Sequence, residues 1–183
     1  MTKTEFQIEK SAIRKAKSDP RSFDYLYQKY FPRINNFVFH RVKDENIKNE
    51  IVSNVFFKAM KKITLFKLKK IRINSFSAWL FRIAINETND YFRKENREKK
   101  IRSQMENRNP ISFKYPINFD IIQEKIQQLP FYEQNLISLR FFEKFKHKEI
   151  AYILGKKENT IKVQMHRTLQ KLRKLLEGEI NYE

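Results

Sequence analysis

The segment Lys148–Lys174 constrains the fold of this chain most, because its small residues have the spacing of a helix-turn-helix. Ala151 stands where two helices would cross, Gly155 at a left-handed turn, and Ile161 where a β-branched side chain fills the space under the second helix. Seven Lys or Arg residues and one acid lie between Lys156 and Lys174. Such a basic helix predicts a surface that contacts phosphate groups.

Helical periodicity divides this second helix into a buried side and an outward side. With Ile161 central, the buried side also holds Met165, Thr168, Leu172 and Leu176. The residues predicted to contact the edges of DNA bases lie in the first turns of the outward side: Lys162, Val163, His166 and Arg167. Lys171 and Lys174 are predicted to hold phosphate groups. The alternative is a solvated basic face on an ordinary helical hairpin.

Charge and composition narrow the function classes. The 183 residues carry a net charge of +18 and a pI near 10.0, which favours a polyanionic partner and a monomer when free. The lack of cysteine excludes disulfides and thiolate metal sites. No apolar run approaches the roughly 20 residues of a membrane-spanning helix, and no signal peptide opens the chain. We therefore expect a cytoplasmic protein without membrane insertion.

Catalysis lacks suitable residues. The histidines are far apart and have no His-x-x-His or cysteine partner: His40, His147 and His166. Helix capping and solvation explain the one local group of acids: Asp44, Glu45 and Glu50. The two glycines, Gly155 and Gly178, are too far apart for a phosphate-binding loop. We expect no enzymatic activity, no metal and no cofactor.

Few glycines and prolines, with apolar residues at helical spacing, predict an all-α protein. A helix over 5–17 would use Phe6, Ile8, Ile13 and Ala16 as its apolar side. The next would be capped by Asp19 or Ser22 and kinked or broken near Tyr30, because Pro32 lies within it. Its core stripe is Phe23, Leu26, Tyr27, Tyr30, Ile34, Phe37, Val38 and Arg41.

Two further helices complete the N-terminal half. Asp44 would cap one whose stripe runs from Ile47 to Ile63, and Asn74 or Ser75 would cap a long helix. Between them, Lys61–Arg72 holds six basic residues and no acid, which suits a loop that tracks a nucleic-acid backbone. The alternative is a solvated, mobile loop. The nearby aromatic residues could stack on bases but are more often core: Trp79, Phe81 and Phe92.

A segment without sustained periodicity, residues 97–117, is predicted to be a flexible linker. It would join two small helical domains, residues 1–96 and 118–183. In the second domain we expect a short helix stopped by Pro130. A helix over about 132–143 would follow, before the helix-turn-helix, with Leu136, Leu139 and Phe142 facing inward.

Four sequence blocks, in this order, resemble the ECF-type sigma factors of the sigma-70 family, which retain only the second and fourth sigma domains. They are FDYLYQKYFPRINNFVFHRV, DENIKNEIVSNVFFKA, SFSAWLFRIAINETNDYFRK and LPFYEQNLISLRFFEKFKHKEIAYILGKKENTIKVQMHRTLQKLRK. Any one block is weak evidence. The four in the family's order, separated by a linker of suitable length, are specific.

The resemblance implies a role for each region. The helix with the IVSNVF block would dock on the clamp coiled coil of the largest subunit of core RNA polymerase through Glu50, Ser53, Asn54 and Phe57. The basic loop and the following helix would open the minus-10 element of promoter DNA. Backbone contacts would come from Lys67, Lys69, Lys70 and Arg72, and helix contacts from Asn86, Asp90 and Arg93. The fourth domain would rest on the polymerase flap and read the minus-35 element. An anti-sigma factor is a further partner that the resemblance allows.

Several positions differ from the family pattern. The usual Asp-Leu-Val-Gln-Glu is replaced by a less acidic stretch, Glu50-Ile51-Val52-Ser53-Asn54. Lys157 stands where a serine commonly caps the recognition helix, so Asn159 or Thr160 is expected to cap it. Val163 and Gln164 replace a small polar residue and an arginine.

The alternative function is a stand-alone helix-turn-helix regulator that binds symmetric half-sites without polymerase.

Overall fold

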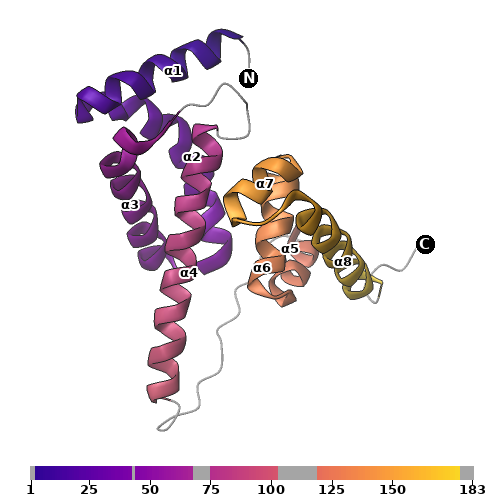
Figure 1. Cartoon of the computed structure of the whole chain (residues 1–183). Coiled ribbons are helices and arrows are strands. Elements are labelled where there is room, and N and C mark those ends of the chain that lie inside the picture. The colour runs from indigo at the N-terminus through magenta and orange to yellow at the C-terminus, as the bar shows by residue number, and fades with distance from the viewer. Residues whose placement is uncertain (1–2, 43, 68–74, 103–118, 178–183) are drawn as a thin grey trace. The chain divides into compact units, whose positions relative to one another are not determined.

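The computed structural model describes residues 3–42, 44–67, 75–102 and 119–177, and these are helical with no strand among them (Figure 1). The N-terminal elements are α1 (Lys3–Ser18), the short 3-10 turn η1 (Pro20–Phe23), α2 (Asp24–Val42), α3 (Glu45–Lys62), the 3-10 turn η2 (Ile63–Leu65) and α4 (Phe76–Arg102). The C-terminal elements are α5 (Phe119–Gln128), α6 (Phe131–Ile137), the π-helical turn η4 (Ser138–Phe142), α7 (His147–Leu154) and α8 (Glu158–Leu176). The predicted all-α class is confirmed.

The chain divides into two compact units, Met1–Phe92 and Arg93–Glu183. The boundary falls inside α4, which continues to Arg102. The helix therefore includes residues 97–102, where we expected the linker to have begun. The rest of the expected linker, 103–117, lies outside the described residues. The domain limits of 96 and 118 stay a prediction.

Polar side chains begin the helices of the first unit at the expected places. Asp19 accepts a hydrogen bond from the Arg21 amide at 3.0 Å, at the start of η1. Asp44 accepts one from the Ile47 amide at 3.0 Å, and Ser75 Oγ accepts one from the Ala78 amide at 3.1 Å. Each side chain satisfies an amide that has no partner within its own helix, so these caps set where the helices start.

The core of the first unit lies among α2, α3 and α4. Its fully buried side chains include Leu26, Ile34 and Val38 of α2, Val55 and Ala59 of α3, and Leu80, Phe81 and Ala84 of α4. Phe76, at the start of α4, packs on the rings of Phe23, Tyr30, Phe66 and Trp79. The stripe predicted for α2 is correct except at Tyr27, which is exposed, and at Arg41, which is only half-buried.

α2 continues through Pro32, so the helix does not break near Tyr30. Proline removes the amide that would bond to the carbonyl four residues earlier, that of Gln28. Pro32 and Gln28 are both exposed, so water can reach that part of the helix. The opposite side of the same turns, with Tyr30 and Ile34, is buried and is held by packing.

α1 crosses one end of this bundle and is held by a buried acid (Figure 1). Glu9 accepts hydrogen bonds from the Tyr30 hydroxyl at 2.7 Å and from Lys29 Nζ at 2.5 Å. Burial, and then the charge of Glu9, raises the pKa of Tyr30 above its usual value, so the hydroxyl keeps its proton. The inward residues of α1 are Ala12, Ile13 and Ala16. Phe6 and Ile8, expected on that side, are exposed.

The second unit departs from the expected helix over 132–143. α6 ends at Ile137 and a wider π-helical turn follows, which changes the direction of each later side chain. Leu136 and Leu139 are fully buried as expected, but Phe142 is exposed. Phe145, beyond the turn, is buried instead. The expectation for Phe142 was wrong because it assumed 3.6-residue spacing to the end.

The helix-turn-helix forms as predicted. Gly155 ends α7 with φ 65° and ψ 36°, in the left-handed region. The Lys156 amide donates to the Ala151 carbonyl at 2.9 Å, which closes the turn. Ile161, Met165, Thr168 and Leu172 are buried on α8, and the half-buried Leu176 ends the same side.

Gly155→Ala should lower the free energy of unfolding by about 1–2 kcal/mol, the cost of the left-handed conformation for a residue with a Cβ. No described atom lies within 4 Å of an added Cβ, so the cost is one of backbone strain alone. Gly155→Asn should cost less, since asparagine tolerates this conformation. Urea unfolding followed by circular dichroism measures both variants. Equal stability of the alanine variant and the wild type would contradict this account.

Candidate functional site

The recognition helix α8 starts one residue after Lys157. Lys157 is the N-cap and provides no side-chain cap, and its carbonyl accepts from the Ile161 amide at 3.1 Å. The expectation that Asn159 or Thr160 would cap a later start was wrong. Glu158 lies in the first turn, where its negative charge interacts favourably with the helix dipole. The helix therefore starts at Glu158 without a polar cap.

The outward side of α8 is solvent-exposed at all six predicted DNA contacts: Lys162, Val163, His166, Arg167, Lys171 and Lys174. Lys162 pairs with Glu158 at 3.2 Å along the helix, and His166 lies 3.1 Å from Gln170. Arg167 and Lys174 form no ion pair with a described residue. A cation without a nearby acid can meet a phosphate or a guanine edge without first breaking an ion pair.

One flank of α8 contacts α6. The Tyr132 hydroxyl donates a hydrogen bond to Gln164 Oε1, and Lys171 Nζ lies 2.5 Å from Glu133 Oε1. Burial raises the pKa of Tyr132, which keeps its hydroxyl a donor. Gln164, which stands where the family usually has an arginine, is thus hydrogen-bonded within the domain. Lys171, the predicted phosphate contact, already has an ion-pair partner. Sequence reasoning missed both partners, because 32 and 38 residues separate the bonded side chains.

A second exposed surface lies on α4. The structure brings together on this one helix the three predicted minus-10 residues Asn86, Asp90 and Arg93, and all three are exposed. The adjacent Glu87 points to α3, where both of its carboxylate oxygens lie 2.6 Å from Lys58 Nζ. This pair fixes α4 against α3. Lys67 is exposed, whereas the three other predicted backbone contacts lie outside the described residues: Lys69, Lys70 and Arg72.

The aromatic residues near these surfaces belong mainly to the core. Phe81 is fully buried, which excludes it from base stacking. Trp79 is half-buried, with ring centroids 5.1 Å from Phe66 and 5.5 Å from Phe76. Lys17 of α1 also donates to the Phe66 carbonyl at 2.5 Å, so the residue before Lys67 is fixed by two other elements. The segment that leads into the basic region therefore starts from a rigid point.

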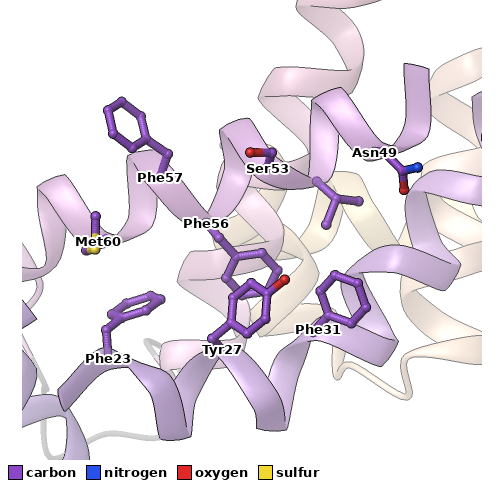
Figure 2. Close-up of a pocket in the computed structure, with 9 residues that line it drawn as sticks. Phe23, Tyr27, Phe31, Asn49, Ser53, Phe56, Phe57 and Met60 are labelled. Carbon is purple, nitrogen blue, oxygen red and sulfur yellow. The ribbon is translucent and has the colours of Figure 1, made fainter. Parts of the chain in front are cut away.

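The third surface is the outward side of α3, where Glu50, Ser53, Asn54 and Phe57 are all exposed. It borders an apolar groove between α2 and α3 (Figure 2). Phe56 points across the groove toward Tyr27 at 4.7 Å between ring centroids, and Phe57 points away from α2. The Phe57 ring is 50% exposed and lies under Lys61 Nζ, 4.4 Å from its centroid. A large exposed ring beside an apolar groove is typical of a protein-binding surface.

Within the described parts of the chain, no group of three or more His, Asp or Glu side chains is placed to hold a metal ion. None of the helices in those same parts has the length and apolar character needed to cross a membrane. Of the three exposed surfaces, that of α8 is basic, that of α4 is polar with charges of both signs, and that of α3 borders an apolar groove. Their chemistry suits binding of a polyanion and of a protein partner.

Two family models match this chain. The model for Sigma-70 region 2 matches residues 26–98, and the model for Sigma-70, region 4 matches residues 119–172. The ECF RNA polymerase sigma factor SigW of Bacillus subtilis is 25% identical, with 94% of this chain and 98% of SigW covered. RNA polymerase sigma factor SigV of the same organism is 29% identical, with 74% and 79% covered. The ECF RNA polymerase sigma factor BldN of Streptomyces coelicolor is 24% identical, and this chain spans 60% of its length.

Two solved structures share the fold. CnrH, in complex with the cytosolic domain of CnrY, has a TM-score of 0.67 and 20% identity, over 92% of this chain and 97% of that chain. RpoE, in complex with the anti-sigma factor NepR from Bartonella quintana, has a TM-score of 0.70 and 21% identity, over 87% and 99%. With both sigma regions matched in order, this chain belongs to the sigma-70 family, in its ECF class.

Phe56 and Phe57 should respond differently to truncation, because one is core and the other is exposed. Phe56→Ala should lower the free energy of unfolding by about 3–5 kcal/mol, the range for a buried phenylalanine. Phe57→Ala should change it by no more than about 0.5 kcal/mol. Urea unfolding measures both. A large loss of stability in the Phe57 variant would contradict the assignment of this ring to a binding surface.

Proposed function

We propose that this chain acts as an ECF-type sigma factor, which binds core RNA polymerase, recognises the minus-35 and minus-10 promoter elements and starts transcription. The observation that carries the proposal is the match to sigma regions 2 and 4, in order, on two helical units with separate exposed surfaces. Opening DNA requires no bond chemistry, so we assign the protein as a binding factor and not as an enzyme. Its proposed place is the cytoplasm, with the polymerase.

The minus-35 element is the proposed target of α8. Lys162, Val163, His166 and Arg167 are assigned to base edges, and Lys174 to the phosphate backbone. Arginine and lysine pair with guanine edges, and the exposed Val163 methyl groups fit a thymine methyl. Gln164 is not assigned to a base edge, because its Oε1 accepts the hydrogen bond from Tyr132 within the domain. Lys171 is paired with Glu133, which competes with phosphate for its charge.

The minus-10 element is the proposed target of α4 and the basic segment before it. Asn86, Asp90 and Arg93 share an exposed helix that can hold an unpaired strand. The backbone contacts assigned to Lys67, Lys69, Lys70 and Arg72 neutralise phosphate groups. Strand opening is then driven by trapping unstacked bases and by releasing counterions, so it weakens as salt concentration rises.

Core polymerase is the proposed partner of α3, through Glu50, Ser53, Asn54 and Phe57, with the clamp coiled coil of the largest subunit as the docking site. The second unit is assigned to the polymerase flap. An anti-sigma factor is a further proposed partner. Support comes from the shared fold with RpoE, whose structure is in complex with the anti-sigma factor NepR.

The stand-alone regulator is the competing function, and it is not favoured by the match to both sigma regions. A footprint from the protein alone over a palindromic site, with no effect of added polymerase, would support it. A sigma factor instead gives a promoter-specific, two-part footprint that depends on polymerase.

Added to core RNA polymerase and a promoter library, the protein should direct transcription from specific start sites. Phe57→Ala should weaken binding to core polymerase about tenfold or more, the effect of truncating a central aromatic anchor. Phe6→Ala is a matched control, because it removes an exposed phenylalanine from α1. Start-site-specific transcripts and a binding titration measure both effects. The absence of specific initiation would refute the sigma function.

Different mutations should impair strand opening and minus-35 recognition independently. Lys69→Ala with Arg72→Ala should reduce permanganate reactivity at the minus-10 element more than it reduces closed-complex binding. Arg167→Ala should instead weaken discrimination among minus-35 sequences by about 1–3 kcal/mol. Arg14→Ala with Lys15→Ala removes two cations from α1 and is the matched control. Normal permanganate reactivity in the first variant would disprove its role in opening.

A further inference from the structure

We propose that Glu133 restrains Lys171 and thereby lowers the affinity of the recognition helix for the DNA backbone. The inference rests on the proposed function, because the restraint affects DNA binding only if α8 contacts DNA. It concerns an acid on α6 that lies outside the recognition helix and is separated from Lys171 by 38 residues. Glu133 is therefore assigned as a positioning residue and not as a DNA contact.

The ion pair is asymmetric in its exposure to water. Glu133 Oε1 lies 2.5 Å from Lys171 Nζ, and the side chains are 17% and 55% exposed respectively. Glu133 Oε2 is buried and has no hydrogen-bond partner among the described residues. Lys171 is thus the group that compensates this carboxylate. If Lys171 moved to a phosphate, a largely buried charge would lose its partner, which is unfavourable.

The adjacent residue of α6 holds the same flank of α8. Tyr132 donates its hydroxyl proton to Gln164, which lies seven residues before Lys171 and therefore two turns away on the same side. Tyr132 and Glu133 are consecutive, so the first turn of α6 lies along this flank. The first turn of α6 thus makes two contacts with this flank of α8. One of them neutralises the charge of Lys171 and holds its side chain toward α6.

The other ion pairs of α8 are of a different kind. Lys162 pairs with Glu158, and Arg173 pairs with Glu177, four residues apart along the helix. The acids of these pairs are more exposed than Glu133, Glu158 at 30% and Glu177 at 59%, so each pair is better screened by solvent and more easily exchanged for a phosphate. Only the Lys171 pair, among the described ion pairs of α8, joins α8 to another helix. Lys171 is therefore the cation of α8 that a phosphate must compete for.

The restraint has a consequence for salt dependence. Each phosphate that a protein neutralises makes the slope of log K against log salt about 0.9 steeper. With Lys171 held by Glu133, α8 makes one phosphate contact fewer than its sequence allows. Glu133→Gln keeps the shape of the side chain and removes its charge, so it should free Lys171 for that contact.

Fluorescence polarisation with a mixed-sequence duplex, at 50 to 200 mM salt, tests this in the full-length chain without polymerase. Glu133→Gln should bind more tightly than the wild type. The ratio of the two affinities should fall about 3.5-fold from 50 to 200 mM salt, as one added phosphate contact requires. Glu133→Gln combined with Lys171→Gln should lose this gain. Glu177→Gln removes the same charge from an exposed pair and should give a smaller, weakly salt-dependent change.

Two outcomes would overturn the inference. A gain that persists when Lys171 is also replaced would show a general effect of net charge. An unchanged or weaker affinity of Glu133→Gln, with an unchanged melting temperature, would show that Glu133 does not restrain Lys171. Glu133→Ala repeats the test if the glutamine variant folds poorly. Promoter-specific transcription by the wild type reports on the proposed function separately, so intact transcription without the predicted gain refutes the restraint alone.

Discussion

Compensation of partly buried charge joins the helices of this strongly basic chain. Three carboxylates with little exposure each pair with a lysine from another helix: Glu9 with Lys29, Glu87 with Lys58, and Glu133 with Lys171. These pairs connect α1 to α2, α3 to α4, and α6 to α8. Such a carboxylate cannot lose its lysine without leaving a poorly solvated charge, so each pair fixes the relative position of two helices.

Local signals in the sequence predicted the helices and their starts well. Asp44 and Ser75 cap the helices they were expected to cap, and Gly155 takes the left-handed turn. The buried side of α8 follows from 3.6-residue spacing around Ile161. These features depend on residues within a few positions of one another. The outward faces of α3, α4 and α8 follow from the same periodicity, so the exposure of the candidate site residues was predictable as well.

Features that depend on contacts between residues far apart in the sequence could not be predicted from these local signals. Phe142 was misplaced because a π-helical turn breaks the period after Ile137. On α1, apolar character wrongly placed Phe6 and Ile8 inward, whereas the acid Glu9 is buried because its partners lie on α2. The bonds of Gln164 and Lys171 to consecutive residues of α6 were missed for the same reason. Nothing in the composition of α8 distinguishes a lysine with a partner on another helix from one without.

The pairs also change the meaning of the net charge. The value of +18 does not tell which cations are available to a polyanion, and Lys29, Lys58 and Lys171 are each held by a carboxylate. Arg167 and Lys174, which form no such pair with a described residue, lie on the outward side of α8. DNA affinity then depends on which cations are unpaired and where they lie, more than on their number. A few acids placed between helices can therefore both hold the fold together and select which basic side chains a promoter meets.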